Sequence, residues 1–257
     1  MFFNYKDISM YYEVSGNHPK SLLILPGWGD TRKTFNYLIN YLSNFFTVYI
    51  IDYPGFGNSN FPNRNLTIFD YSELIYEFIQ DRNLIDPILI GHSFGGRIIT
   101  VLTGYYKYHF SNIILIDSAG IKPKKNIKIR IRNLSYKLLK KLSKIVPKKY
   151  RDRYIQKVFS YFASTDYQNL NQNMRDTFKN IVNTNLKDYL KYINSKVLLV
   201  WGNNDDATPI RDARIMNKEI RNSELIIIDK AGHFPYLDRP MLINSILYEQ
   251  LKEEIQN

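Results

Sequence analysis

The chain contains no cysteine among its 257 residues. This absence excludes disulfide bonds, a thiol nucleophile and thiolate metal sites. Histidine is scarce as well. The four histidines are scattered along the chain and show no ligand spacing with carboxylates, so we expect no metal centre. The glycine-rich loops that cradle nucleotide and dinucleotide phosphates are missing too. We therefore expect no cofactor.

Long apolar runs are also lacking. No run approaches the roughly 20 apolar residues of a membrane span, and the N-terminus has no basic segment followed by a long apolar core. We therefore expect a cytoplasmic protein. Hydrophobic residues still make up 44% of the chain, which is enough for one large domain with room for an inserted subdomain.

Short apolar runs of strand length alternate with amphipathic stretches of helix length. Residues 35–42 and 71–79 have helical spacing, and residues 2–14 indicate an antiparallel pair of strands. Five runs are almost wholly apolar, which is typical of strands that are buried on both faces. These runs are residues 21–25, 88–90, 113–116, 197–201 and 225–228. The alternation predicts an α/β fold with a mostly parallel sheet and helices on both faces.

The sequence Gly-His-Ser-Phe-Gly at residues 91–95 follows one of these predicted strands and precedes a stretch that can continue as a helix. A sharp turn from strand to helix forces the residue at its apex, Ser93, into an unfavourable backbone conformation and exposes its hydroxyl. A serine presented in this way is suited to act as a nucleophile. Turn chemistry alone can also place glycines here, so the interpretation depends on finding a base and an acid.

His233 is the candidate base. It lies on a loop directly after the apolar run 225–228, and a histidine beyond the last strand can reach a serine that is distant in sequence. The other histidines lie within the turn itself, where the side chain is expected to point away from the exposed face of Ser93, or in surface segments. They are His92, His18 and His109.

These segments together resemble the α/β-hydrolases, whose catalytic residues follow the order Ser, Asp, His. In that family the acid stands three residues after a glycine and four before a proline. Asp205 fits this position, whereas Asp206 is off by one, and Asp117 occupies a place that some hydrolases use for their acid. The resemblance therefore implies a triad of Ser93, His233 and Asp205, with the two other aspartates as alternatives.

Two further segments carry the resemblance. Residues 26–30, Pro-Gly-Trp-Gly-Asp, stand where the family usually begins its oxyanion loop with His-Gly, so the proline is a departure from the pattern. The resemblance implies that the backbone N–H groups of Trp28 and Phe94 form the oxyanion hole. Residues 52–59 look like the D-x-P-G-x-G-x-S segment of many family members. The resemblance spans residues from about 20 to 240.

The net charge of +11 is concentrated in one part of the chain. Residues 122–157 hold 15 lysines and arginines and a single acid, Asp152, for a net charge of +14, whereas the remainder carries −3. This excess lies between two predicted strands, where α/β-hydrolases place a cap, or lid, over the active site. We therefore predict a core domain of residues 1–120 and 196–257 and a helical, strongly basic cap of residues 121–195.

Within the predicted cap, apolar residues recur at helical spacing over residues 131–145, and residues 150–162 form a second helical stretch. Two interpretations remain open. Either the apolar face packs on the domain and the lysines are solvated, or the basic surface attracts an anionic substrate or an anionic membrane surface. No nucleic-acid-binding motif accompanies the charge, so we expect no nucleic acid partner.

The resemblance implies a serine hydrolase that acts through an acyl-enzyme intermediate on a small-molecule acyl substrate. A carboxylesterase acting on small or medium acyl esters is the leading hypothesis. Thioester, lactone and carbon–carbon bond hydrolases use the same machinery, and a membrane-surface lipase is a further alternative. A non-catalytic small-molecule receptor is the alternative from another class. Three aromatic residues adjoin the catalytic backbone and are expected either to line an acyl pocket or to pack inward: Trp28, Phe94 and Phe234.

Overall fold

The computed structural model describes residues 1–122, 135, 139, 141–143, 146–162, 170 and 172–256. The chain divides into two compact units, Met1–Lys122 with Asn180–Asn257, and Pro123–Lys179. The first unit contains the sheet and every candidate site residue. The cap boundaries at residues 121 and 195 stay a prediction. The expected helical stretch 131–145 lies largely outside the described residues, whereas the expected stretch 150–162 is helical.

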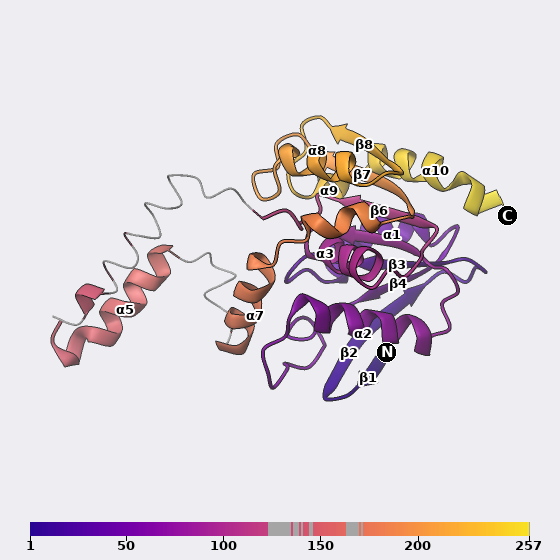
Figure 1. The fold of residues 1–257 in the computed structure, drawn as a ribbon. Coiled ribbons are helices and arrows are strands. Elements are labelled where there is room, and N and C mark those ends of the chain that lie inside the picture. Colours follow the sequence, from indigo (N-terminus) through magenta and orange to yellow (C-terminus); the bar gives the residue numbers. More distant parts are fainter. Residues whose placement is uncertain are drawn as a thin grey trace. The chain divides into compact units, whose positions relative to one another are not determined.

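The described elements can be followed in Figure 1. The strands are β1 (Phe2–Tyr5), β2 (Ile8–Ser15), β3 (Ser21–Leu25), β4 (Thr47–Ile51), β5 (Ile88–His92), β6 (Asn112–Ile116), β7 (Lys196–Gly202) and β8 (Ser223–Ile228). The α-helices are α1 (Arg32–Leu42), α2 (Ile68–Asp81), α3 (Phe94–Thr100), α5 (Lys148–Phe162), α7 (Gln172–Asn183), α8 (Ile210–Glu219), α9 (Pro235–Asp238) and α10 (Pro240–Gln256). A π-helix, Val101–Tyr105, follows α3, and a 3-10 helix, Lys187–Tyr192, precedes β7.

The eight strands form one sheet in the order β1-β2-β4-β3-β5-β6-β7-β8. The strands from β4 through β3 to β8 are parallel to their neighbours, whereas β1 and β2 pair antiparallel, as do β2 and β4. The expected antiparallel pair at residues 2–14 is therefore confirmed. So is the fold class, a mostly parallel sheet with helices on both faces.

Alternate residues of the central strands enter two separate hydrophobic layers, one on each face of the sheet. On β5, Leu89 packs with residues of α2, α3 and α8, whereas Ile88 and Ile90 pack with residues of α1, α9 and α10. The all-aliphatic strands have this pattern because a parallel sheet covered on both sides has no solvent face. The predicted helices 35–42 and 71–79 lie within α1 and α2 and supply one layer each.

The sheet topology positions the candidate site. Strands β3, β5, β6, β7 and β8 are parallel, so their C-terminal ends lie at one edge of the sheet, where ligands bind in open α/β sheets. The segments that follow these ends carry the candidate site residues. They are Trp28 after β3, Ser93 after β5, Asp117 after β6, Asp205 after β7 and His233 after β8.

The helices of the described residues offer no candidate for a membrane span, since none is both long enough and apolar enough. The cytoplasmic location stays a prediction.

Candidate active site

Ser93 lies at the apex of the turn between β5 and α3. Its φ is 48° and its ψ is −105°, a conformation that a residue with a side chain rarely adopts. Two backbone hydrogen bonds hold it in this conformation: Ser93 N donates to Ile116 O at 3.1 Å, and Ala119 N donates to Ser93 O at 3.0 Å. The end of β6 and the segment after it therefore bind both the N–H and the carbonyl group of the strained residue, as expected for a functional turn.

Gly95 explains why the turn needs a small residue two positions after the serine. A Cβ atom at Gly95 would collide with the carbonyl oxygen of Leu25 at the end of β3. The same close approach allows Gly95 N to donate to Pro26 O at 3.0 Å. The turn that carries Ser93 is therefore fastened directly to the loop that follows β3.

His233 and Asp205 form the most clearly defined polar contact of the site. The Nδ1 atom of His233 lies 2.8 Å from Asp205 Oδ2, and the Asp205 side chain is fully buried, whereas that of His233 is 20% exposed. An ionised carboxylate can only accept, so His233 carries its proton on Nδ1 and leaves Nε2 as a base. No hydrogen bond joins Ser93 Oγ to His233 among the described residues, and such bonds commonly form only when substrate is present.

Asp205 is held by three further donors from its own loop. Asp205 Oδ1 accepts from Ala207 N at 2.7 Å and from Thr208 N at 3.0 Å, and the Thr208 hydroxyl donates to Oδ2. Burial on its own would raise the pKa of Asp205, but the hydrogen bonds from His233 and Thr208 outweigh it and hold that pKa well below its usual range. Asp205 is therefore ionised at neutral pH and fixes the orientation of His233. The sequence reasoning missed Thr208, although its place three residues after an aspartate in a loop is a recognisable turn signal.

The two alternative acids have different surroundings. Asp206 is exposed. Asp117 is fully buried and has an oxygen within 4.8 Å of the ligand atoms of Asp205 and His233; its Oδ1 accepts from Gly202 N at 3.0 Å, and its carboxyl group also interacts with Asp205. Of the three aspartates, only Asp205 has a hydrogen bond to His233 within the part of the chain that is described.

The side chains of the two residues expected to supply the oxyanion donors, Trp28 and Phe94, are in contact. The ring centroids of Trp28 and Phe94 are 5.2 Å apart, in an edge-to-face arrangement. Phe94 is the first residue of α3, so its N–H has no acceptor within the helix. The Phe94 side chain is only 2% exposed and packs inward against Tyr53 and Tyr71. The alternative in which this ring lines an acyl pocket is not supported.

Phe234 lies beside the candidate base rather than in the interior. Its side chain is half-buried, and its ring centroid is 5.3 Å from that of His233 and 4.9 Å from that of His92. Its role as a pocket residue stays a prediction. The close approach of the His92 ring, next to Ser93 in sequence, was not expected. The sequence gives no local signal for it, because the contact joins residues 141 positions apart.

Asp117, Asp205 and His233 are also the one group of possible metal ligands within the described residues. Asp205 Oδ2 and His233 Nδ1, however, already share a proton in their hydrogen bond. A metal ion on the same two atoms would have to displace that proton. The cluster is therefore better described as a carboxylate–imidazole pair with a second buried carboxyl group behind it.

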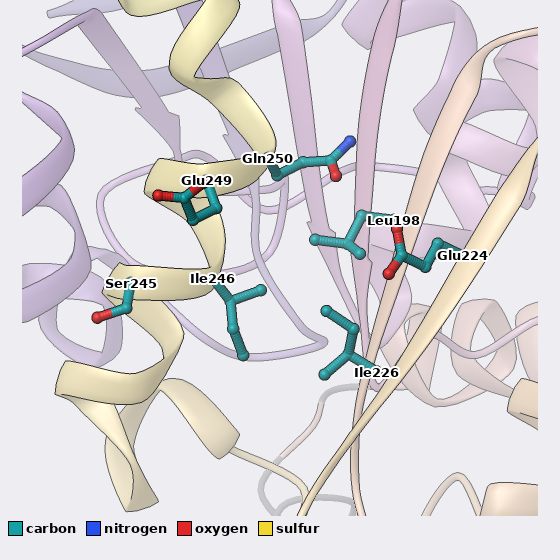
Figure 2. A pocket seen from close by; sticks show the side chains of 7 residues that line it. All are labelled: Leu198, Glu224, Ile226, Ser245, Ile246, Glu249 and Gln250. Atoms are coloured by element: carbon teal, nitrogen blue, oxygen red, sulfur yellow. The ribbon is translucent and has the colours of Figure 1, made fainter.

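A separate groove of about 400 Å³ lies between β7, β8 and α10 (Figure 2). Leu198, Ile226 and Ile246 form its apolar wall, and Glu224 and Glu249 bring two carboxylates to it. None of its lining residues is a candidate catalytic residue. The groove therefore adds nothing to the chemistry of the triad.

The geometry at the edge of the sheet agrees with the family comparison, in which the model of the alpha/beta hydrolase fold matches residues 20–240. The chain belongs to the α/β-hydrolase fold family. This membership confirms the resemblance seen in the sequence motifs, and with it the prediction that the chain is a hydrolase.

Curated α/β-hydrolase relatives cover nearly the whole chain. The pimeloyl-(acyl-carrier protein) methyl ester esterase of Wigglesworthia glossinidia brevipalpis is 28% identical over 264 residues, covering 95% of this chain and 98% of that protein. The esterase of the same description from Vibrio vulnificus strain YJ016 is 22% identical and covers 90% of this chain and 93% of that protein. An uncharacterised hydrolase of Bacillus subtilis is also 22% identical, with 97% of both chains covered.

Solved structures of α/β-hydrolases have the same fold. A hydrolase from Pseudomonas aeruginosa superposes with a TM-score of 0.76 at 17% identity, covering 98% of this chain and 97% of that chain. A lipase-like protein from Acinetobacter baumannii has a TM-score of 0.76 at 22% identity, covering 100% of this chain and 92% of that chain. At these identities the likeness concerns the fold alone.

Proposed function

We propose that this protein is a carboxylesterase that uses Ser93 as nucleophile, His233 as general base and Asp205 as the acid that orients the base. The observation that carries the proposal is the 2.8 Å contact between His233 Nδ1 and the buried Asp205 carboxylate. This contact lies at the same sheet edge as the strained Ser93. The arrangement supplies each group that acyl transfer to serine needs.

The mechanism follows from the tautomer of His233. Its unprotonated Nε2 takes the hydroxyl proton as Ser93 Oγ attacks the ester carbonyl, and Asp205 stabilises the imidazolium that forms. The N–H groups of Trp28 and Phe94 bind the developing oxyanion, a contribution of about 10²- to 10³-fold in rate for each donor. His233 then returns the proton to the leaving alcohol, and water hydrolyses the acyl-enzyme by the same route.

The first substrates to test are methyl esters of medium-length acyl chains, free and attached to a carrier protein. Two of the relatives described above are methyl ester esterases acting on an acyl chain of that kind. The basic segment at residues 122–157, with its net charge of +14, supports an anionic substrate or carrier. Small and medium acyl esters remain the substrate class that the proposal names.

The proposal is tested by labelling with a fluorophosphonate probe, which reacts with activated serines. The wild type is compared with Ser93→Ala, His233→Ala and Asp205→Asn, and Asp206→Asn is the matched control. We expect fast labelling of the wild type and of the control, no labelling of the Ser93 variant, and labelling slowed by at least about 10³-fold in the other two.

A well-folded wild type that does not label would contradict the proposal and favour the non-catalytic receptor. Equal loss in Asp205→Asn and Asp206→Asn would contradict the assignment of the acid. A labelled enzyme is then given methyl esters, thioesters and lactones in parallel, and faster hydrolysis of either of the latter two would overturn the carboxylesterase proposal in favour of that activity.

A further inference from the structure

His92, the last residue of β5, is a buried titratable group to which the proposed mechanism gives no role. Its side chain is 1% exposed. Its ring centroid is 4.8 Å from that of His233, 4.9 Å from that of Phe234 and 6.1 Å from that of Phe35. A single ring therefore contacts both α1 and the loop that carries the candidate base.

The polar atoms of His92 face two loops of the candidate site. His92 Nε2 lies 2.7 Å from the carbonyl oxygen of His233, and a carbonyl can only accept, so Nε2 carries the proton and donates it. Burial lowers the pKa of His92, which keeps the ring neutral and makes Nδ1 an acceptor. Nδ1 lies 3.4 Å from Tyr236 Oη, which can donate to it, and 3.4 Å from Asp30 Oδ2.

The loop after β3 packs directly on the same ring. A Cβ atom at Gly27 would lie 2.9 Å from His92 Nδ1 and would collide with the Asp30 carboxylate, so a larger residue here would displace these side chains. Pro26, just before Gly27, stands where the family usually has histidine and offers no side-chain donor. The ring of His92 therefore packs directly against this loop at Gly27.

We propose that His92 is a positioning residue, which holds the loop of His233 and the loop of Trp28 in fixed places relative to Ser93. The three segments follow different strands, and among the described residues His92 is in contact with all of them. The proposal rests on the proposed function, because it assigns His92 an effect on the same acyl transfer. A displacement of catalytic groups by about 1 Å can cost about 10²-fold in rate.

Three substitutions separate positioning from simple packing. His92→Phe keeps the ring but removes the donor. His92→Gln places an amide donor near the position of Nε2, whereas His92→Asn has an amide that is too short to reach the His233 carbonyl. We expect kcat on an activated ester to fall about 10- to 100-fold in the Phe and Asn variants with KM changed less than about 3-fold. The Gln variant should stay within about 5-fold of the wild type.

A second measurement does not depend on turnover. The NMR signal of the His233 Nδ1 proton, bonded to Asp205, should be sharp in the wild type and in His92→Gln, and shifted or broadened in His92→Phe and His92→Asn. A wild type with neither labelling nor turnover, but with this NMR pattern, would contradict the proposed function while supporting the positioning role. A wild-type kcat and an unchanged His233 signal in His92→Phe would overturn the inference, as would failure of Gln to restore what Asn loses.

Discussion

Of the two buried carboxyl groups next to His233, one is ionised and the other is neutral at neutral pH. Asp205 is kept ionised by the hydrogen bonds from His233 and Thr208, in spite of its burial. Burial, together with the hydrogen bond and the charge of the neighbouring Asp205, raises the pKa of Asp117 to about 9, and the hydrogen bond from Gly202 N offsets only part of this rise. The pair therefore carries one negative charge, located on the residue that contacts the base.

Replacing Asp117 by asparagine tests this charge state. The native Asp117 binds a proton that the unfolded chain releases above a pKa of about 4, so the contribution of Asp117 to the stability of the wild type falls as pH rises from about 4 towards 9. Asparagine has no such proton. We therefore expect the Asp117→Asn variant to become more stable relative to the wild type as pH rises. The difference in free energy of unfolding between the two should change in favour of the variant by at most about 1.4 kcal/mol per pH unit.

The measurement is urea denaturation of both proteins at pH 5, 7 and 8.5. All other titrating groups are shared, so their effects cancel in the difference. A difference that stays constant across this range would show that Asp117 is ionised in the folded protein.

Sequence reasoning at the residue scale found the groups whose roles depend on local motifs. Ser93 was predicted because glycines around a serine between strand and helix are a local signal, and the structure places it in a strained turn. Thr208 and His92 were not assigned a role. The signal for Thr208 is local, since it lies three residues after Asp205, whereas the partner of His92 is set by packing between strands. His92 and the carbonyl it binds are 141 residues apart, and no local pattern records such a contact.

At the scale of elements, α3 contributes more than the turn that carries Ser93. Arg97, buried at 4% exposure, reaches from α3 to the end of α7, where it donates to the carbonyl oxygens of Ile181 and Thr184. The last carbonyls of a helix have no partner within it, and a positive charge there is also favourable to the helix dipole. Burial lowers the pKa of Arg97 to about 10, so it remains charged at neutral pH.

Replacing Arg97 by methionine keeps the aliphatic stem and removes both hydrogen bonds. We expect the free energy of unfolding to fall by about 2 to 4 kcal/mol, because a buried carbonyl and a half-buried one lose a charged donor. Arg97→Lys keeps the charge without the forked geometry and should lose less. Urea denaturation at pH 7 measures both, and a methionine variant as stable as the wild type would show that water satisfies the two carbonyls equally well.

Most elements of the core could be predicted because burial of a strand or of a helix face requires a recognisable pattern of apolar residues in the sequence. The aliphatic runs became β3, β5, β6 and β7, since strands covered on both faces need apolar residues at successive positions. The run 225–228 became part of β8, an edge strand that is only partly buried, so its apolar pattern overstates its burial. The expected helix after Ser93 begins as α3 but changes to a π-helix at Val101. That change has no signal in the sequence, because the apolar residues there suit either helix.

For the whole molecule, the sequence shows where the charge is concentrated but not what it contacts. The basic segment at residues 122–157 carries +14 and the remainder −3. Apolar residues at helical spacing predict that one face of a helix is buried, but they do not identify the surface that buries it. Attraction of an anionic substrate by this segment therefore stays a prediction, and it is open to a direct test.

Varying the salt concentration distinguishes a basic segment that attracts anionic substrates from one whose lysines and arginines are merely solvated. If the basic segment attracts anionic substrates, kcat/KM for a negatively charged ester should fall several-fold between 0.02 and 0.5 M NaCl, because exposed charges are screened over about 10 Å at 0.1 M. A neutral ester of the same acyl length is the matched substrate and should change little. Lys149→Gln with Arg153→Gln, two exposed cations of α5, should weaken the effect. Identical salt dependence of the two esters would contradict the attraction.

The order of the strands also bears on how the protein is made. The nucleophile turn follows β5, whereas the base follows β8, the last strand, and His92 is separated from its partner carbonyl by 141 residues. At about 5–20 residues per second, a ribosome needs on the order of ten seconds to synthesise that interval. During that time a growing chain holds Ser93 without its base. A nascent or C-terminally truncated chain should therefore be inert towards esters, and activity should appear only after β8 has joined the sheet.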